Sequence, residues 1–193
     1  MKKTLMLAAS LFLIVGVTKA QHSGVHFGLK AGMNASSLSN TNSDTKIGFN
    51  AGVLAHIHTS SKSWAIQPEL LYSLEGAKSK ANSDVKTNLS YLNVPVLVQY
   101  LFNNGFRLEA GPQIGFLMSA KNKVGGSSTD IKDAFNTTNF SIPVGLGYLT
   151  RYGLGFDARY NFGITDITKA ASKVHANTFQ FGLFYQFSDS KMK

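Results

Sequence analysis

The stretch Leu154-Gly-Phe-Asp-Ala-Arg-Tyr-Asn-Phe-Gly163 alternates two kinds of side chain with a period of two. One phase holds Leu154, Phe156, Ala158, Tyr160 and Phe162, and the other holds Gly155, Asp157, Arg159, Asn161 and Gly163. A period of two is that of a β-strand, in which successive side chains point to opposite faces. The stretch therefore predicts a strand with one apolar face and one polar face that carries charges.

Seven further segments repeat this pattern. They run from about Val25 to Ala35, Lys46 to His58, Trp64 to Glu75, Leu92 to Phe102, Phe106 to Met118, Phe140 to Tyr148 and Thr178 to Phe187. After residue 20 the chain has 21 Phe, Trp and Tyr residues, and 17 of them share the apolar phase. The polar phase holds 11 glycines at strand positions. Segments of about 10 to 13 residues are long enough for a tilted strand to cross a bilayer.

The connections between these segments alternate in length. Short links lie at Thr59–Ser63, Asn103–Gly105 and Arg151–Gly153, and long links at Ser36–Thr45, Ala77–Asn88, Ala120–Asn139 and Thr165–Asn177. Outer-membrane barrels have short periplasmic turns, longer external loops and both termini on the periplasmic side. The sequence therefore predicts an all-β fold, an eight-stranded antiparallel up-and-down transmembrane β-barrel. The third long loop, rich in Asn and Ser with Gly125-Gly126, is expected to be mobile.

A soluble lipocalin-like barrel is the alternative, because it also has eight strands but turns its apolar face inward around one ligand. Seventeen aromatic side chains would overfill such a lumen, whereas glycines suit a narrow interior. The membrane barrel is therefore favoured. Each of Pro68, Pro95, Pro112 and Pro143 removes a ladder donor, so local bulges or bends are expected at these positions.

The N-terminus has the features of a secretory signal peptide. Lys2 and Lys3 precede the apolar run Leu5–Val17, and Thr18-Lys19-Ala20 offers a small-residue cleavage site. A transmembrane anchor is the alternative, but the run is short for a span. We therefore expect a cleaved signal peptide at residues 1–20, a barrel domain at residues 21–187, a tail at residues 188–193, and localisation in the outer membrane of a Gram-negative bacterium.

Composition excludes several classes of function. The chain has 19 Lys and Arg against 10 Asp and Glu, a formal net charge of +9, and three of the lysines lie in residues 1–20. An exported chain without a basic cluster between exposed aromatics does not fit nucleic-acid binding, and attraction to anionic lipid headgroups is the simpler explanation. Because no cysteine is present, lipoprotein anchoring, disulfides and thiolate chemistry are excluded. No cofactor is expected.

Seven charged residues have the inward phase of the predicted barrel. They are Lys30, Glu69, Glu75, Arg107, Glu109, Asp157 and Arg159. Unpaired charges in a narrow interior cost several kcal/mol each, so a plug of salt bridges is expected. A gated pore or a proton path is the alternative interpretation.

Histidines supply the weak candidates for chemistry. His26, His56 and His58 are expected to lie together at the periplasmic mouth of the barrel. Three imidazoles in one place are candidate ligands of a transition metal, and the alternative is that they serve only as polar residues of the mouth. A lipid-modifying hydrolase needs a nucleophile, a histidine and a carboxylate near the external loops. Only His175, with Ser172 nearby, lies on that side. The chain is therefore not expected to be an enzyme, and no catalytic residue is assigned.

The predicted external loops are basic. They carry Lys78, Lys80, Lys86, Lys121, Lys123, Lys132, Lys169 and Lys173 against Asp84, Asp130, Asp133 and Asp166. The excess of positive charge suits contact with lipopolysaccharide phosphates around the rim. Adhesion to an acidic partner is the alternative.

Four motifs carry a family resemblance. Gln67-Pro-Glu-Leu-Leu-Tyr-Ser-Leu-Glu-Gly76 and Tyr91-Leu-Asn-Val-Pro-Val-Leu-Val-Gln-Tyr100 resemble the third-strand and fourth-strand signatures of the Bacteroidetes outer-membrane β-barrel family, often described as PorT-like. Leu108-Glu-Ala-Gly-Pro-Gln-Ile-Gly115 and Asp157-Ala-Arg-Tyr-Asn-Phe-Gly-Ile-Thr-Asp166 are similar to its later strands.

The resemblance implies two further expectations. Gln180, Gly182, Tyr185 and Phe187 in the last strand resemble the signal read by the outer-membrane barrel assembly machinery. The family name implies a second possible role, as an accessory component of a protein-secretion complex. From the residues themselves, the leading expectation is a non-enzymatic structural or interaction barrel, and an outer-leaflet lipid enzyme is the least favoured.

Overall fold

The computed structural model describes residues 24–39, 43–79, 85–125, 127–169 and 174–187. The predicted signal peptide at residues 1–20 and the predicted tail at residues 188–193 lie outside these residues, so both stay predictions. In the part of the chain that the structure describes, no helix is long and apolar enough to span a membrane.

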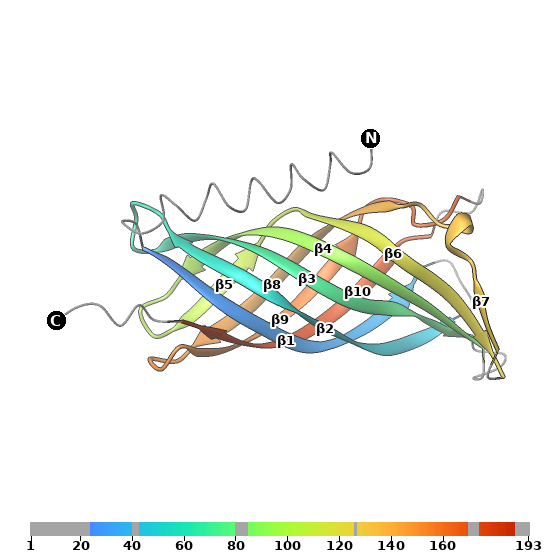
Figure 1. Cartoon of the computed structure of the whole chain (residues 1–193). Coiled ribbons are helices and arrows are strands. Elements are labelled where there is room, and N and C mark those ends of the chain that lie inside the picture. The colour runs from blue at the N-terminus through green and yellow to red at the C-terminus, as the bar shows by residue number, and fades with distance from the viewer. Residues whose placement is uncertain (1–23, 40–42, 80–84, 126, 170–173, 188–193) are drawn as a thin grey trace.

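One antiparallel sheet closes on itself to form a barrel (Figure 1). Its strands are β1 (Val25–Leu38), β2 (Ser43–His58), β3 (Trp64–Ser79), β4 (Lys86–Leu101), β5 (Phe106–Ala110), β6 (Gln113–Val124), β8 (Thr138–Leu149), β9 (Leu154–Gly163) and β10 (Ala176–Gln186). β5 and β6 together form one strand of the wall, because both pair with β4 and with β8. Pairing of β10 with β1 completes a ring of eight strands, which confirms the predicted fold class.

The two faces of the wall decide between a membrane barrel and a soluble one. Phe49 is 62 % exposed and Phe181 is 55 % exposed, whereas Lys30 is 3 % and Arg159 is 2 % exposed. Apolar side chains therefore cover the outside and charges lie within the lumen, the arrangement that a bilayer requires. The lipocalin-like alternative, with its apolar face inward, is excluded.

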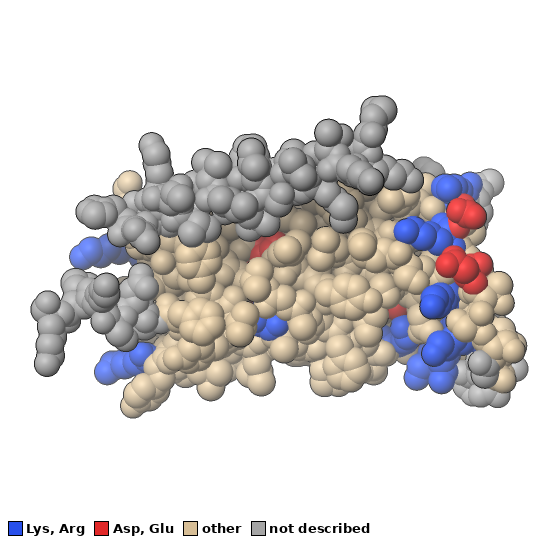
Figure 2. Space-filling model, viewed as in Figure 1, with Lys and Arg blue, Asp and Glu red and all other residues tan. Residues whose placement is uncertain are grey.

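Aromatic contacts form a band near each end of the outer surface. At the turn end, the ring of Tyr100 lies 5.1 Å from that of Trp64 and 5.0 Å from that of Phe102, measured between centroids. At the loop end, the ring of Tyr160 lies 4.5 Å from Phe162 and 4.9 Å from Phe179. Such girdles mark the two membrane interfaces of an outer-membrane barrel. On the face visible in Figure 2, coloured charges gather at the two ends and the surface between them is mainly tan.

The third external loop contains regular secondary structure that the sequence did not predict, and its expected mobility stays a prediction. It contains the end of β6, the short strand β7 (Ser127–Asp130) and a 3-10 turn η2 (Lys132–Ala134). β7 pairs with β6 from Lys121↔Asp130 to Val124↔Ser127. β6 and β7 therefore form a hairpin that extends beyond the barrel wall. Because this hairpin is held by backbone hydrogen bonds and has no alternation of apolar side chains, the sequence pattern did not indicate it.

The prolines do not produce the predicted bulges. The ladder is interrupted at Gly111-Pro112, but β5 and β6 keep the same register against β4. Around Pro143, the pairs Ile142↔Phe162 and Val144↔Tyr160 also preserve one register. Register shifts occur elsewhere, between Thr45 and Asn50 and between Ser90 and Tyr91. The expectation of bulges was wrong, because a proline removes one N–H donor without inserting a residue into the strand, whereas the expectation of bends stays a prediction.

Candidate functional site

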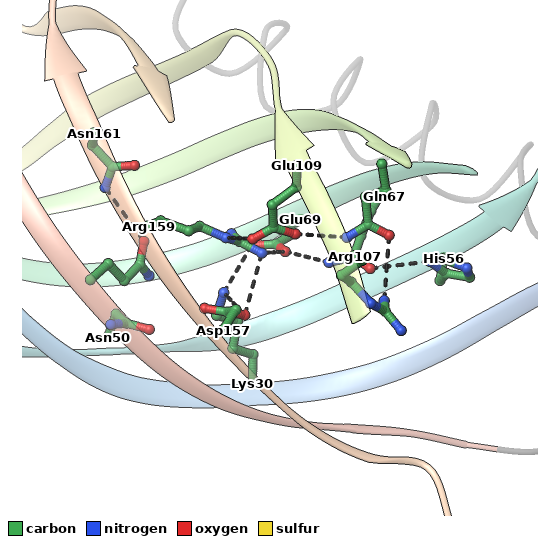
Figure 3. A network of polar contacts seen from close by, with 12 residues as sticks. Lys30, Asn50, His56, Gln67, Glu69, Arg107, Glu109, Asp157, Arg159 and Asn161 are labelled. Carbon is green, nitrogen blue, oxygen red and sulfur yellow. Dashed lines mark hydrogen bonds and ion pairs between the residues drawn. The ribbon is translucent and has the colours of Figure 1, made fainter. Parts of the chain in front are cut away.

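Five ionised side chains meet in the middle of the lumen (Figure 3). Lys30 Nζ lies 2.6 Å from Asp157 Oδ2 and 3.8 Å from Glu69 Oε2. The two terminal nitrogens of Arg159 each lie 2.7 Å from a carboxylate oxygen of Glu69, and Arg159 Nε donates to Glu109. Their side chains are at most 1 % exposed. Because burying an unpaired charge costs several kcal/mol, this mutual pairing explains how a narrow lumen holds them.

Two glutamines extend this network. Gln67 Nε2 donates to Glu69 Oε1 at 2.7 Å, and Gln99 Nε2 donates to Glu109 Oε2 at 2.8 Å. Arg107 Nη1 in turn donates to Gln99 Oε1 at 3.4 Å. The network thus reaches from the central ion pairs to Arg107 through a neutral amide.

Glu75 lies apart from the central group. Its carboxylate accepts hydrogen bonds from Ser73 Oγ at 2.8 Å and Asn93 Nδ2 at 3.1 Å, and Lys46 Nζ donates to its backbone oxygen at 2.7 Å. The structure places all seven charges expected in the interior at buried positions. Five form ion pairs, whereas Glu75 and Arg107 have no oppositely charged side chain within ion-pair distance among the described residues.

An apolar cluster, here called the loop cap, packs against the inner face of the strands at the loop end. Its buried members are Leu89, Tyr91, Leu117, Ala120, Phe135, Ile167, Val174 and Ala176. Asn136 N donates to Ile167 O at 2.8 Å, and Ile167 N donates to Val174 O at 2.9 Å. Backbone hydrogen bonds therefore join the third and fourth loops above the lumen.

A cavity of about 340 Å³, here called the turn-end vestibule, opens at the opposite end of the barrel. Its walls include His26, His56, His58, Arg107, Arg151 and Gln186, and none of the described residues that line it is acidic. By the orientation rule of outer-membrane barrels, this end faces the periplasm.

The three histidines proposed as weak metal ligands do lie together in the turn-end vestibule. The rings of His56 and His58 are 4.7 Å apart and those of His26 and His58 are 5.7 Å apart, both in edge-to-face contact. His56 Nδ1 lies 3.2 Å from Gln67 Oε1, which links the vestibule to the interior network. Within the described ranges, no group of three or more His, Asp or Glu residues is placed to hold a metal ion.

Three lysines line up across neighbouring strands at the loop end. Lys78 on β3 is the register partner of Lys86 on β4, and Lys86 is the partner of Lys123 on β6. Register partners share one face of a sheet, so these side chains form a continuous lysine row. Asp44 stands opposite Lys78 at one end of the row. Figure 2 shows blue side chains concentrated at this end of the molecule.

His175 does not complete a hydrolase site with described residues. Its Nδ1 lies 3.3 Å from Thr165 O, and its Nε2 lies 3.7 Å from Asp166 Oδ1. Ser39 Oγ accepts a hydrogen bond from the backbone N–H of His175, so its contact is not with the imidazole. Ser172 lies outside the described residues.

The proposed assembly-signal residues lie on β10 or directly after it. Gln180 faces the lumen, where Asn161 Nδ2 donates to its side-chain oxygen at 3.4 Å. Tyr185 and Phe187 face outward, with ring centroids 5.5 Å apart. A Cβ added at Gly182 would lie 2.6 Å from Lys30 Cε, so this glycine leaves the space through which the lysine passes. Their recognition by the assembly machinery stays a prediction.

Sequence reasoning missed the loop cap and the alignment of the lysine row. Phe135 and Ile167 are apolar residues within polar loops, and this is a signal that could have indicated a buried loop. The lysine row could not be read from the sequence, because cross-strand partners depend on the register of each hairpin.

Comparison with known proteins supports the same class of fold. Among solved structures, the fold resembles Neisserial surface protein A, with a TM-score of 0.58 and 16% identity over 86% of this chain and 98% of that one. It also resembles Ail, the attachment invasion locus protein of Yersinia pestis, with a TM-score of 0.52 and 17% identity over 84% of this chain and 97% of that one. At these identities the likeness shows the fold alone. No curated protein matches the chain.

A family model decides the assignment. The model described as outer membrane protein beta-barrel domain matches residues 19–169, well over half of the chain. The match agrees with the closed ring, the outward apolar face and the aromatic girdles, and it places the protein in the outer membrane. The narrower PorT-like and Bacteroidetes assignment stays a prediction. The chain belongs to the outer membrane protein β-barrel domain family.

Proposed function

We propose that this outer-membrane barrel is a non-enzymatic interaction protein whose lysine row binds polyanions at the cell surface, with lipopolysaccharide phosphates as the first candidate. The observation that carries the proposal is the register of Lys78, Lys86 and Lys123 on three adjacent strands. If lysines were merely frequent in the loops, they would not be expected to align on three adjacent strands.

The lysine row is electrostatically unfavourable without an anion. Like charges directly opposite each other on neighbouring strands destabilise a sheet. One carboxylate, Asp44, stands in register with Lys78, whereas Lys86 is flanked by lysine on both sides. A phosphate group beside the row would relieve this repulsion, and each lysine near an anionic surface contributes about 1 kcal/mol of attraction.

The position of the row suits an outer-leaflet ligand. Lys86 and Lys123 lie at the loop ends of their strands, beyond the apolar part of the outer surface. In an outer-membrane barrel the loop end faces the cell exterior, where lipopolysaccharide phosphates surround the wall. The ligand is therefore expected beside the barrel, at the height of the lipid headgroups.

The test compares two triple variants with the same change in charge. Lys78→Gln, Lys86→Gln and Lys123→Gln together remove the row, whereas Lys121→Gln, Lys132→Gln and Lys169→Gln remove other loop lysines. Affinity for purified lipopolysaccharide and for sucrose octasulfate is measured by calorimetry on refolded protein. Ail has been crystallised with sucrose octasulfate, a heparin analogue, which serves here only as a defined polyanion.

The row variant is expected to lose about tenfold or more in affinity, since three surface charges are removed. The matched variant is expected to stay within about threefold of the unmodified protein, because its lysines are not aligned. Equal losses in both variants would show that only net charge matters and would reject the lysine row as a site.

A role as an accessory component of a secretion complex is the second candidate. Its support is the resemblance of Gln67–Gly76 and Tyr91–Tyr100 to PorT-like signatures. Pull-down from gently solubilised membranes distinguishes the two functions, because it should recover secretion subunits under this candidate and mainly lipopolysaccharide under the first. Export through the predicted signal peptide and insertion by the assembly machinery are common to both.

A further inference from the structure

Arg107 is a buried cation whose hydrogen-bond donors are mostly without acceptors among the described residues. It is 3 % exposed and lines the turn-end vestibule. Of its N–H donors, only one on Nη1 has an acceptor among the described residues, and that bond to Gln99 Oε1 is 3.4 Å long. Its Nε is buried without a partner. Buried donors are normally satisfied, so such a guanidinium indicates a missing acceptor.

A second unsatisfied donor lines the same cavity. Gln186 is 5 % exposed, and its Nε2 is buried with no hydrogen-bond partner in the described part of the chain. The other polar residues of the wall are the three histidines, Asn103, Thr150 and Arg151, and no carboxylate is among the described residues that line it. The vestibule therefore presents donors and positive charge, without an acidic side chain to accept from them.

We propose that the turn-end vestibule is a binding site for a small oxyanion, a phosphate or a carboxylate, held by the guanidinium of Arg107 and the amide of Gln186. A planar guanidinium donates two parallel hydrogen bonds to the paired oxygens of such an anion. The ligand reaches the site from the periplasm, because the loop cap covers the other end of the lumen.

The guanidinium is held in place before any ligand arrives. Arg107 Cζ lies 5.4 Å from the centroid of the Phe184 ring, in cation–π geometry. A Cβ added at Gly147 would lie 3.2 Å from Arg107 Cγ, so this glycine leaves room for the arginine stem. Fixed orientation reduces the entropy lost on binding.

The charge of Arg107 is not the reason for the proposal. The central network holds the carboxylates of Glu69, Glu109 and Asp157 against the cations Lys30 and Arg159, so Arg107 balances the remaining carboxylate at a distance. The proposal rests instead on the unused hydrogen-bond donors of Arg107 and Gln186, two side chains that line the vestibule. The cavity, at about 340 Å³, is within the range of small-molecule sites and has room for an organic group on the anion.

The experiment follows the Arg107 Nε–H signal by NMR in ¹⁵N-labelled, refolded full-length protein. Inorganic phosphate, acetate and chloride are titrated separately at equal ionic strength. A saturable shift is expected with phosphate, acetate or both, and the stronger of the two identifies the class of oxyanion. No saturable shift is expected with chloride, which lacks the paired oxygens of the proposed ligand.

Two arginine variants separate the site from general positive charge. In both variants binding is followed by the side-chain NH2 signals of Gln186, because Arg107→Gln has no Arg107 Nε–H group. Arg107→Gln should weaken binding by about tenfold or more, since it removes a charged hydrogen-bond donor. Arg151→Gln removes an exposed arginine of the same mouth and should stay within about threefold. Equal weakening by both variants, an equal response to chloride, or an unmoved Arg107 signal in the unmodified protein overturns the proposal. The Arg107 signal is measured in the unmodified protein, so this test can be made even if Arg107→Gln does not fold.

Discussion

Arg159 on β9 reaches across the lumen to Glu69 on β3, and its two terminal nitrogens each lie 2.7 Å from a carboxylate oxygen. In the ring of strands, β3 and β9 are separated by β2, β1 and β10 on one side and by β4, the β5–β6 strand and β8 on the other. The two residues therefore join opposite walls of the barrel. A lumen that two side chains can bridge directly has no room for an open channel at this level.

Replacement of Glu69 by Gln should destabilise the barrel strongly. It leaves Arg159 with one partner fewer in a buried site, and breaking a buried ion pair costs about 3–5 kcal/mol. Urea unfolding in phospholipid vesicles, followed by the fluorescence of the single tryptophan Trp64, measures the loss. Glu75→Gln is the matched control on the same strand. Because the carboxylate of Glu75 bonds to neutral groups, that variant should lose much less, and equal losses would contradict the central role of the ion pair.

The protein should not form a stable pore. The ion pairs around Arg159 fill the centre of the lumen and the loop cap covers one end. Planar-bilayer recordings of the refolded protein should therefore show no reproducible unitary conductance under conditions in which an open porin conducts. Large and regular current steps would show that the network opens, and would favour the gated-pore interpretation.

Trp64 should lie in contact with lipid. Its side chain is 45 % exposed at the turn end of β3 and belongs to an aromatic girdle with Tyr100. Because such girdles lie at the membrane interface, phospholipids brominated close to the headgroup should quench its fluorescence more than those brominated at the chain end. Absence of quenching by either lipid would place the apolar face away from the bilayer.

Replacement of Phe135 by Ala should open the loop cap. Phe135 is buried among Tyr91, Leu117 and Ile167, and loss of a buried phenylalanine costs about 3 kcal/mol or more. Trypsin should then cleave the third loop faster at Lys132, as followed by gel electrophoresis of protein in vesicles. Val124→Ala removes an exposed side chain of the same loop and should leave the cleavage rate unchanged. Similar rates in the two variants would mean that the cluster does not hold the loops.

Side-chain alternation was sufficient to predict the wall of the barrel. Between Leu154 and Gly163 the alternation identified the strand and also the face that each residue occupies. This is possible because the backbone hydrogen bonds lie in the plane of the sheet, so that each side chain points to one face or to the other. Phe184 breaks the alternation of β10, and the structure places it inside the lumen beside Arg107. The sequence thus indicated the inward charges residue by residue, although it could not give their partners.

Partners depend on tilt and register, which a single sequence does not encode locally. Lys30 and Asp157 are far apart in the chain, and their contact follows from the way in which β1, β10 and β9 are offset. The hairpin of Lys121–Val124 with Ser127–Asp130 was missed for a related reason: its pairing uses backbone groups, and its side chains are almost all polar.

The contact between Lys30 and Asp157 lies across the seam of the barrel, where the first strand meets the last. Lys30 belongs to β1 and Asp157 to β9, and Gly182 of β10 lies beneath the lysine stem between them. The two charges cannot form an ion pair until β10 has paired with β1. Closure of the barrel and pairing of Lys30 with Asp157 are therefore one event, and in an unfinished barrel only the more distant Glu69, at 3.8 Å, can face the ammonium group.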